Sequence, residues 1–187
     1  MLQHKYGKKN IKVCPAGTFD PLATGVLMFC LGKATQRAEA LQAEEPSYVA
    51  EIKLGETTPC FDLEKEVDAT YPYEHITEES ISAVLPSFLG EIDQIPPVFS
   101  AKMIGGKRAY EFARKGQEVE MKPARITISD LEILSFRSPI LTLRVRCSKG
   151  TYIRSLARDL GVELQSGAHL VGLKRTRSGS MLVEDCY

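Results

Sequence analysis

The sequence has no net charge, no paired-cysteine motif and no long apolar run, and each absence excludes a class of protein. Its five cysteines are odd in number and none belongs to a Cys-x-x-Cys pair, which argues against both a disulfide framework and a zinc knuckle. No apolar stretch reaches the length that spans a bilayer, and no signal peptide opens the chain. We therefore expect a soluble protein of a reducing compartment, the cytoplasm.

The composition is that of one folded domain. The chain has 187 residues, 43% of them hydrophobic, with seven tyrosines and seven phenylalanines. A chain of this length can bury a substantial core, and this apolar share is typical of a globular protein rather than a disordered one.

The balanced charge is unevenly distributed along the chain. Residues 1–37 have six Lys or Arg against one acid, residues 38–94 have two against fourteen, and residues 101–187 have sixteen against nine. The three net charges are therefore +5, −12 and +7. A zero total argues against nucleic-acid binding, but a polarised chain can offer a basic face to phosphates. From charge alone, an ordinary solvated surface explains the pattern equally well.

The most informative stretch is Gly-Thr-Phe-Asp-Pro-Leu-Ala-Thr-Gly-Val-Leu at residues 17–27, called the catalytic string below. Asp20 is its single carboxylate and lies between two glycines, which permit unusual backbone angles. Pro21 removes a backbone donor and pushes Asp20 towards an extended or turn conformation. The apolar residues 26–31 then predict a buried strand, so Asp20 is expected on a stiff turn at the edge of a sheet. Taken alone, the pattern fits an ordinary Asp-Pro turn better.

The whole string closely resembles the catalytic motif of the bacterial tRNA pseudouridine synthases of the TruB family, which modify the TΨC-loop uridine at position 55. Three further stretches, residues 94–116, 147–154 and 167–177, resemble the same family in the same order. The resemblance covers nearly all of the chain but only the middle of a full family member. The family's first strand with a Lys-Pro pair and its C-terminal RNA-binding domain of the PUA type have no counterpart. We therefore expect residues 1–187 to be a truncated catalytic domain.

The resemblance implies a mixed α/β (α+β) pseudouridine-synthase fold: a largely antiparallel central sheet, flanking helices and a basic, thumb-like insertion at about residues 96–124. Two prolines, a glycine hinge and five cationic residues within residues 94–116 indicate that this insertion is mobile and can close over RNA. Residue patterning predicts strands at residues 48–55, 125–136, 140–147 and 167–177. It predicts helices at residues 33–43, 77–88 and 153–164, with Pro86 kinking or ending the second.

The resemblance also assigns the chemistry. Asp20 is the expected nucleophile, attacking either the ribose C1′ or the uracil C6 of a flipped-out uridine, and Arg154 is expected to pair with it and keep it ionised. Tyr152 is the candidate base for the C5 proton, or the residue that positions one, although a phenol with an ordinary pKa of about 10 is a poor base at neutral pH. The isomerisation needs no redox change, energy input or metal, so we expect no cofactor.

Substrate binding is assigned in the same way. Tyr48 is expected to stack on the flipped uracil and Leu173 to fill the pocket floor, which offsets part of the cost of unstacking. Four cationic residues are predicted RNA contacts: Lys107, Arg108, Lys149 and Arg175. The loop at residues 57–65 departs from the family pattern and is predicted as a further substrate contact.

Two departures from the family bear on RNA handling. Cys14 and Pro15 stand where relatives have Gly-His, and Met103 stands where relatives commonly have lysine. His169 follows a helix-ending glycine and is predicted to be structural rather than a replacement for the missing histidine. We expect weaker RNA handling with the Asp20 chemistry preserved.

Two functions fit these observations. The first is a monomeric isomerase that acts on tRNA, with no membrane or metal partner. The second is a non-catalytic tRNA-binding or tRNA-folding protein, or an inactive fragment, with the same fold. A third possibility, an unrelated domain with a plain Asp-Pro turn, is improbable because four stretches match in order.

Overall fold

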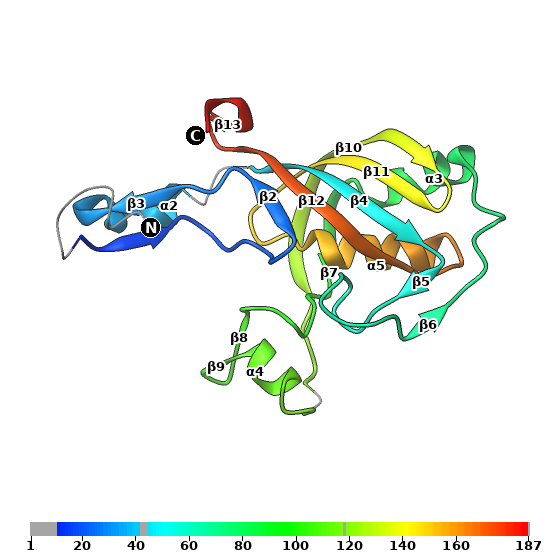
Figure 1. The fold of residues 1–187 in the computed structure, drawn as a ribbon, viewed down its shortest axis with the longest axis horizontal. Helices are drawn as coiled ribbons and strands as arrows, with labels where there is room; N and C mark the ends of the chain where they lie inside the picture. Colours follow the sequence, from blue (N-terminus) through cyan, green and yellow to red (C-terminus); the bar gives the residue numbers. More distant parts are fainter. Residues whose placement is uncertain (1–10, 42–44, 118, 187) are drawn as a thin grey trace.

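A curved central sheet organises the protein, whose computed structural model describes residues 11–41, 45–117 and 119–186 (Figure 1). The first ten residues of the basic N-terminal segment therefore lie outside the described part. The sheet has seven strands in the order β13-β12-β4-β11-β10-β7, with β2 beside β12. Their bounds are β13 (Met181–Leu182), β12 (Ala168–Ser178), β4 (Ser47–Leu54), β11 (Ile140–Cys147), β10 (Ala124–Arg137), β7 (Gly90–Gln94) and β2 (Ala23–Gly25). Every neighbouring pair is antiparallel except β2 with β12, which confirms the predicted largely antiparallel sheet.

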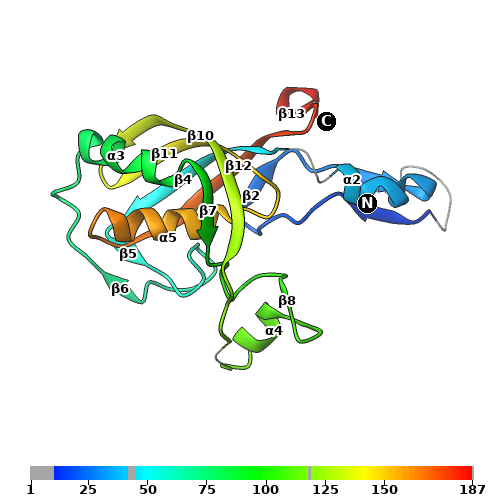
Figure 2. The same cartoon turned by 180° about the vertical axis from the view of Figure 1, so that it is seen from behind.

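Alternating apolar residues give the sheet one buried face. On β11 four alternate residues, Leu141, Leu143, Val145 and Cys147, have no exposed surface. Helix α5 (Ile153–Glu163) covers this face with its apolar stripe, as Figures 1 and 2 show. The four strands predicted over residues 48–55, 125–136, 140–147 and 167–177, and this helix, agree with the structure to within a residue or two at each end.

The second predicted helix is divided at Pro86. Helix α3 (Glu78–Val84) begins at the N-cap Thr77, whose hydroxyl accepts a hydrogen bond from the Ser80 amide. It is followed by the 3-10 turn η2 (Leu85–Phe88), in which Pro86 occupies an early position. Proline cannot donate to the preceding α-helical turn, so the prediction that it kinks or ends the helix is confirmed.

A small hairpin lobe extends to one side of the sheet (Figure 1). It pairs β1 (Val13–Pro15) with β3 (Phe29–Leu31), and η1 (Gly32–Arg37) and α2 (Ala38–Leu41) follow. The catalytic string is the connection between these two strands. The single buried strand predicted over residues 26–31 is wrong, because Val26 bonds to β12 before the chain leaves the central sheet to pair with β1.

The helix predicted over residues 33–43 is also only partly correct. The segment begins as a 3-10 turn and becomes α-helical only at Ala38. Leu31 occupies the N-cap and no side chain caps the first turn, so nothing stabilises an α-helical start. Residues 42 and 43 lie outside the described part of the chain.

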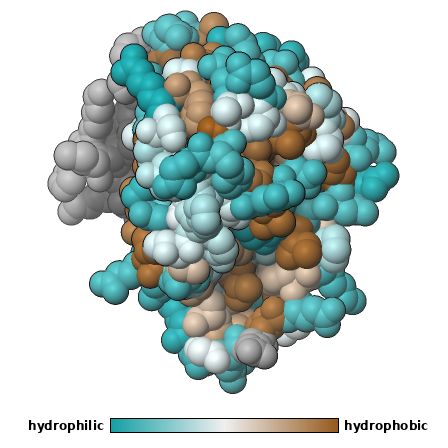
Figure 3. All heavy atoms as spheres, turned by 90° about the vertical axis from the view of Figure 1, so that its right-hand side faces the viewer, coloured by the Kyte–Doolittle hydropathy of each residue, from teal (hydrophilic) through white to brown (hydrophobic). Residues whose placement is uncertain are grey.

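Between β7 and β10 a separate segment projects below the sheet, at the position of the predicted insertion (Figure 1). It contains β8 (Met103–Ile104), β9 (Lys107–Arg108) and α4 (Ala109–Ala113). The remaining short elements are β5 (Glu56–Thr57), β6 (Ala69–Thr70) and η3 (Val183–Asp185). Seen from the side, hydrophilic side chains cover most of the upper surface and apolar patches interrupt them lower down (Figure 3). Within the described residues, no helix is long and apolar enough to cross a membrane.

Candidate active site

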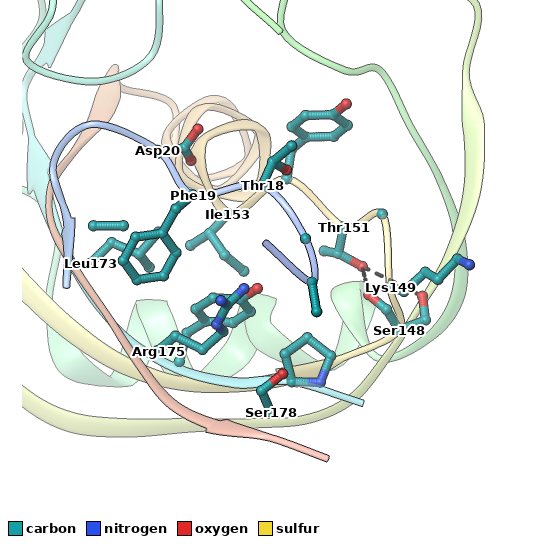
Figure 4. A pocket seen from close by; sticks show the side chains of 17 residues that line it. Thr18, Phe19, Asp20, Ser148, Lys149, Thr151, Ile153, Leu173, Arg175 and Ser178 are labelled. Atoms are coloured by element: carbon teal, nitrogen blue, oxygen red, sulfur yellow. Dashed lines mark hydrogen bonds between the residues drawn. The ribbon is translucent and has the colours of Figure 1, made fainter. Parts of the chain in front are cut away.

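A cavity of about 270 Å³ lies where the catalytic string meets the sheet and the start of α5 (Figure 4). The string supplies one wall, β4 and β12 supply the floor, and the loop before α5 supplies the opposite wall. Six predicted site residues line this cavity: Asp20, Tyr48, Lys149, Tyr152, Leu173 and Arg175. Residues that are far apart in the sequence therefore meet here.

Asp20 and Arg154, predicted to pair, lie in direct contact. Nη2 of Arg154 donates to Oδ1 of Asp20 at 2.7 Å. The arginine side chain is 4% exposed and the aspartate side chain 27%, so the carboxylate is the part of the pair that solvent or a ligand can reach. A charge-assisted hydrogen bond of this kind is short and fixes the orientation of the carboxylate.

Asp62 is a second carboxylate at the same arginine, and no motif singled it out. Its Oδ2 lies 3.3 Å from Nη1 of Arg154, and its side chain has no exposed surface. Its Oδ1 accepts a hydrogen bond from the amide of Glu64. The loop at residues 57–65 thus supports Arg154 from within the protein rather than offering this acid to a substrate. The sequence offers one signal that Asp62 is buried: it is flanked by two apolar residues, Phe61 and Leu63, within a stretch that is otherwise rich in acidic residues.

Backbone carbonyls complete the surroundings of Arg154. Its Nη1 donates to the carbonyl oxygens of Phe99, at 3.0 Å, and Cys60, at 3.3 Å. The guanidinium is therefore shared between two carboxylates and two carbonyls. Because all of these partners are fixed by the fold, Arg154 has little freedom to rotate away from Asp20.

Gln94 holds the backbone that leads into Arg154. Its Oε1 accepts from the amide of Tyr152 at 2.9 Å, and its Nε2 donates to the Tyr152 carbonyl at 3.1 Å. Gln94 is 2% exposed, so this two-point contact is shielded from water. Tyr152 is the N-cap residue of α5, and the contact fixes where the helix begins.

Tyr48 and Leu173 both line the cavity, on the neighbouring strands β4 and β12. Tyr48 on β4 is opposite Arg175 on β12, and Leu173 is opposite Ala50. Burial raises the pKa of the Tyr48 phenol, and the Arg175 guanidinium opposes part of that rise. Tyr48 is therefore neutral at physiological pH, which suits a ring that stacks on a base.

The predicted cationic residues are not all in one place. Lys149 is exposed, and its side chain points away from Asp20 in Figure 4. Lys107 and Arg108 are exposed on β9 in the projecting segment and do not line the cavity. Arg175, in contrast, is 6% exposed and lies under the catalytic string.

The remaining predictions concern three residues outside the centre of the site. His169 is 2% exposed and its Nδ1 lies 3.2 Å from the Glu56 carbonyl, which fits the predicted structural role. Pro15 is exposed at the end of β1 and offers no hydrogen-bonding side chain. Met103 is 59% exposed on β8.

Comparisons with known proteins agree with this geometry. A family model described as TruB family pseudouridylate synthase (N terminal domain) matches residues 3–153. A protein of Parabacteroides distasonis named tRNA pseudouridine synthase B is 57% identical over 185 residues, which are 99% of this chain and 79% of that protein. A protein of the same name from Phocaeicola vulgatus is 58% identical over 182 residues, 97% of this chain and 77% of that protein.

Solved structures show the same fold. A chain in the structure entitled Crystal Structure of a Cbf5-Nop10-Gar1 Complex superposes with a TM-score of 0.70 and 29% identity, over 95% of this chain and 43% of that chain. A chain in an H/ACA RNP bound to a substrate RNA containing 2′-deoxyuridine gives a TM-score of 0.66 and 27% identity, over 95% and 41% of the two chains. This chain thus spans about two fifths of those solved chains. It belongs to the TruB family of pseudouridylate synthases.

Proposed function

We propose that this protein converts a uridine of tRNA, the TΨC-loop uridine at position 55, to pseudouridine, with Asp20 as the nucleophile. The observation that carries the proposal is the Asp20–Arg154 ion pair at the wall of a cavity lined by Tyr48, Tyr152 and Leu173. The relatives at 57% and 58% identity are named tRNA pseudouridine synthase B, which supports a tRNA uridine as the substrate.

The chemistry requires a nucleophile that stays ionised. Asp20 forms a bond to C1′ or C6 of the uridine, and the glycosidic N–C bond breaks. The ring rejoins the ribose through C5, and cleavage of the bond to Asp20 regenerates the free carboxylate. Substrate and product have the same composition, so no co-reactant is consumed. Arg154 orients the Asp20 carboxylate, and its own partners hold it in place throughout the reaction.

The C5 proton must leave after the new C–C bond forms. Tyr152 borders the cavity at the start of α5, held there through its backbone by Gln94. We assign Tyr152 as the residue that takes this proton or positions the group that takes it. Tyr48 stacks on the flipped uracil, and Leu173 closes the apolar floor beneath it.

The RNA is held outside the cavity by exposed cations. Lys107 and Arg108 project from the segment between β7 and β10, and Lys149 lies at the cavity rim. Lys and Arg supply phosphate contacts that do not depend on sequence, and the uridine must unstack at a cost of a few kcal/mol to enter the site. We propose that the segment between β7 and β10 is the thumb of a single catalytic domain and that the protein acts as a monomer.

A mapping experiment tests the proposal. An unmodified tRNA transcript is incubated with the protein, pseudouridines are tagged with a carbodiimide, and the tags are located as stops in reverse transcription. We expect one new stop, in the TΨC loop, which disappears when that uridine is replaced by cytidine. A transcript that is bound but never modified would contradict the isomerase and support the alternative, a tRNA-binding protein without turnover.

A further inference from the structure

Arg175 was predicted as an RNA contact, but its side chain is turned into the protein. It lies on β12, 6% exposed, and borders the cavity between Tyr48 and the catalytic string. A buried arginine is uncommon unless it has specific partners, so its contacts indicate what it does.

The far end of the catalytic string is tied to Arg175 by two hydrogen bonds and a close approach of the two backbones. Nε of Arg175 donates to the Val26 carbonyl at 2.6 Å, and the Arg175 carbonyl accepts from the Val26 amide at 2.9 Å. At Gly25, with φ at +96°, an added Cβ would lie 2.2 Å from the same Arg175 carbonyl oxygen. The backbone of the string at Gly25 therefore packs directly against the backbone of Arg175, and only glycine fits at this point.

The near end of the string is held by the same guanidinium. Its central carbon lies 4.7 Å from the centre of the Phe19 ring, within the range of a cation–π contact (Figure 4). Phe19 immediately precedes Asp20. Fixing the ring fixes the backbone from which the catalytic carboxylate projects.

We propose that Arg175 is a positioning residue: it contacts the catalytic string on both sides of Asp20, at Phe19 and at Val26, and so fixes the string in place. The string is then held between two buried arginines: Arg154 binds the carboxylate itself and Arg175 binds the chain that carries it. This proposal rests on the proposed function and adds Phe19 and Arg175 to its machinery. The sequence-based prediction that Arg175 contacts RNA stays a prediction, because Arg175 also borders the cavity.

Single-turnover kinetics distinguish a residue that positions Asp20 from a residue that binds the RNA. Single-turnover isomerisation is measured against enzyme concentration for Arg175→Met, Arg175→Lys, Phe19→Ala and the double variant Phe19→Ala/Arg175→Met. If Arg175 positions Asp20, Arg175→Met lowers the maximal rate by about tenfold or more, while the half-saturating concentration changes less than about twofold. Arg175→Lys recovers part of the rate because an ammonium group keeps the cation–π contact.

The double variant tests whether Phe19 and Arg175 act as one unit. Residues that work through a shared contact are non-additive, so the double variant is expected to be about as slow as the slower single variant. Arg144→Met is the matched control, because Arg144 is a half-exposed arginine on β11 paired with Glu132. A raised half-saturating concentration with an unchanged maximal rate, or fully additive effects, would overturn the proposal.

An exchange measurement keeps this proposal independent of turnover. The amides of Ala23 and Val26 donate to the carbonyls of Asp20 and Arg175 and report the order of the string. We expect faster hydrogen–deuterium exchange across residues 17–27 in Arg175→Met than in the parent or Arg144→Met. If the parent protein itself fails to isomerise uridine, the proposed function fails, whereas unchanged exchange in Arg175→Met refutes the positioning role.

A second inference is carried by the register of the hairpin lobe. Cys14 on β1 is directly opposite Cys30 on β3 in the antiparallel pair. Both side chains belong to the same small apolar cluster as Ala16 and Ala38, so they point to one face. Opposed residues in such a pair have Cα atoms about 4.5–5.5 Å apart, within the span of about 4.4–6.8 Å that a disulfide bridges.

We propose that Cys14 and Cys30, both free thiols here, form a reversible disulfide site that closes the base of the loop carrying Asp20. The oxidant is a small disulfide of the oxidised-glutathione class. The Cys14 thiolate attacks one sulfur of the oxidant and releases one glutathione thiolate, which takes up a proton. The Cys30 thiol, as its thiolate, then attacks the Cys14 sulfur and releases the second glutathione. Two protein thiols are oxidised and one glutathione disulfide is reduced to two thiols.

Peptide mass mapping tests this site without any activity assay. The folded protein is equilibrated with oxidised glutathione, free thiols are alkylated, and peptides are compared with and without dithiothreitol. We expect a reducible cross-link between Cys14 and Cys30 in the parent and in Cys186→Ser. In Cys30→Ser we expect Cys14 to retain bound glutathione. Persistent glutathione on Cys14 in the parent, or no reaction at either thiol of the folded chain, would refute the site.

Discussion

The buried carboxylate of Asp62 lies 3.3 Å from Nη1 of Arg154, while Nη2 of the same guanidinium bonds Asp20 at 2.7 Å. One arginine thus serves two acids with different surroundings. Asp20 borders the cavity, whereas Asp62 is absent from its lining and has no exposed surface. Asp62 therefore supports the reaction through Arg154 and does not meet the nucleotide.

Removing the Asp62 charge should damage both stability and activity. A buried cation that loses one of its partners is strongly unfavourable, so Asp62→Ala is expected to lower the free energy of unfolding by about 3–5 kcal/mol. Asp62→Asn keeps the shape and should cost less, while still lowering the isomerisation rate. Urea unfolding checks the first value, with the exposed Asp130→Asn on β10 as the control, expected within about 0.5 kcal/mol of the parent. Equal stability of Asp62→Ala and Asp130→Asn would show that the buried pair is not stabilising.

A methyl group at Gly25 should disrupt the catalytic string. Gly25 and Gly32 both have positive φ, at +96° and +56°, so alanine strains the backbone at either position. Only Gly25 lies against other atoms, since a Cβ at Gly32 would meet nothing within 4 Å. We expect Gly32→Ala to cost about 1 kcal/mol and Gly25→Ala considerably more, with loss of turnover. Thermal unfolding of the two variants measures the difference, and similar melting temperatures would argue against the close approach to Arg175.

Stability should fall in alkali because of Cys147. Burial raises the pKa of this thiol from 9.0 to about 12. Between those two pKa values the folded state binds more protons than the unfolded state. The thiol's contribution to the free energy of unfolding is therefore complete below about pH 9 and is lost as the pH rises towards about 12. The loss amounts to at most about 1.4 kcal/mol per pH unit. Urea unfolding at about pH 8 and about pH 10.5 should therefore show a shallower pH dependence for Cys147→Ala than for the parent. Cys186 is exposed, so Cys186→Ala should show the same pH dependence of stability as the parent. The same pH dependence in Cys147→Ala would exclude the Cys147 thiol as the cause of the loss of stability in alkali.

Exposed cations on β9 should govern the salt dependence of tRNA binding. Each phosphate contact that is removed lowers the slope of log affinity against log salt by about 1, so the double variant Lys107→Gln/Arg108→Gln should lose up to about 2. Filter binding across a salt series gives the slopes. Arg144→Gln, which removes an ion-paired cation from the sheet, should leave the slope unchanged. An unchanged slope in the double variant would place the RNA elsewhere.

The fold was largely predictable from local patterning, and the site only in part. Alternation on β11 and the apolar stripe of α5 report which face is buried, so those elements and the mixed α/β fold were predicted correctly. Asp62 was not found, because its contact joins it to an arginine ninety-two positions later through packing that no local pattern encodes. Arg175 was predicted only as an RNA contact, from the family resemblance, and no local pattern indicates that its side chain is buried against the catalytic string. The hairpin that carries the string was missed because Val26 belongs to one sheet and Phe29 to another.

Asp20 is the proposed nucleophile, and release of the C5 hydrogen of uridine tests this role most directly. tRNA that contains C5-tritiated uridine is incubated with the parent, Asp20→Asn and the control Asp130→Asn, and free tritium is counted over time. We predict release by the parent and Asp130→Asn, and none by Asp20→Asn, although Asp20→Asn should still bind tRNA. Release by Asp20→Asn at the parental rate would contradict the assignment of Asp20 and, with it, the proposed mechanism.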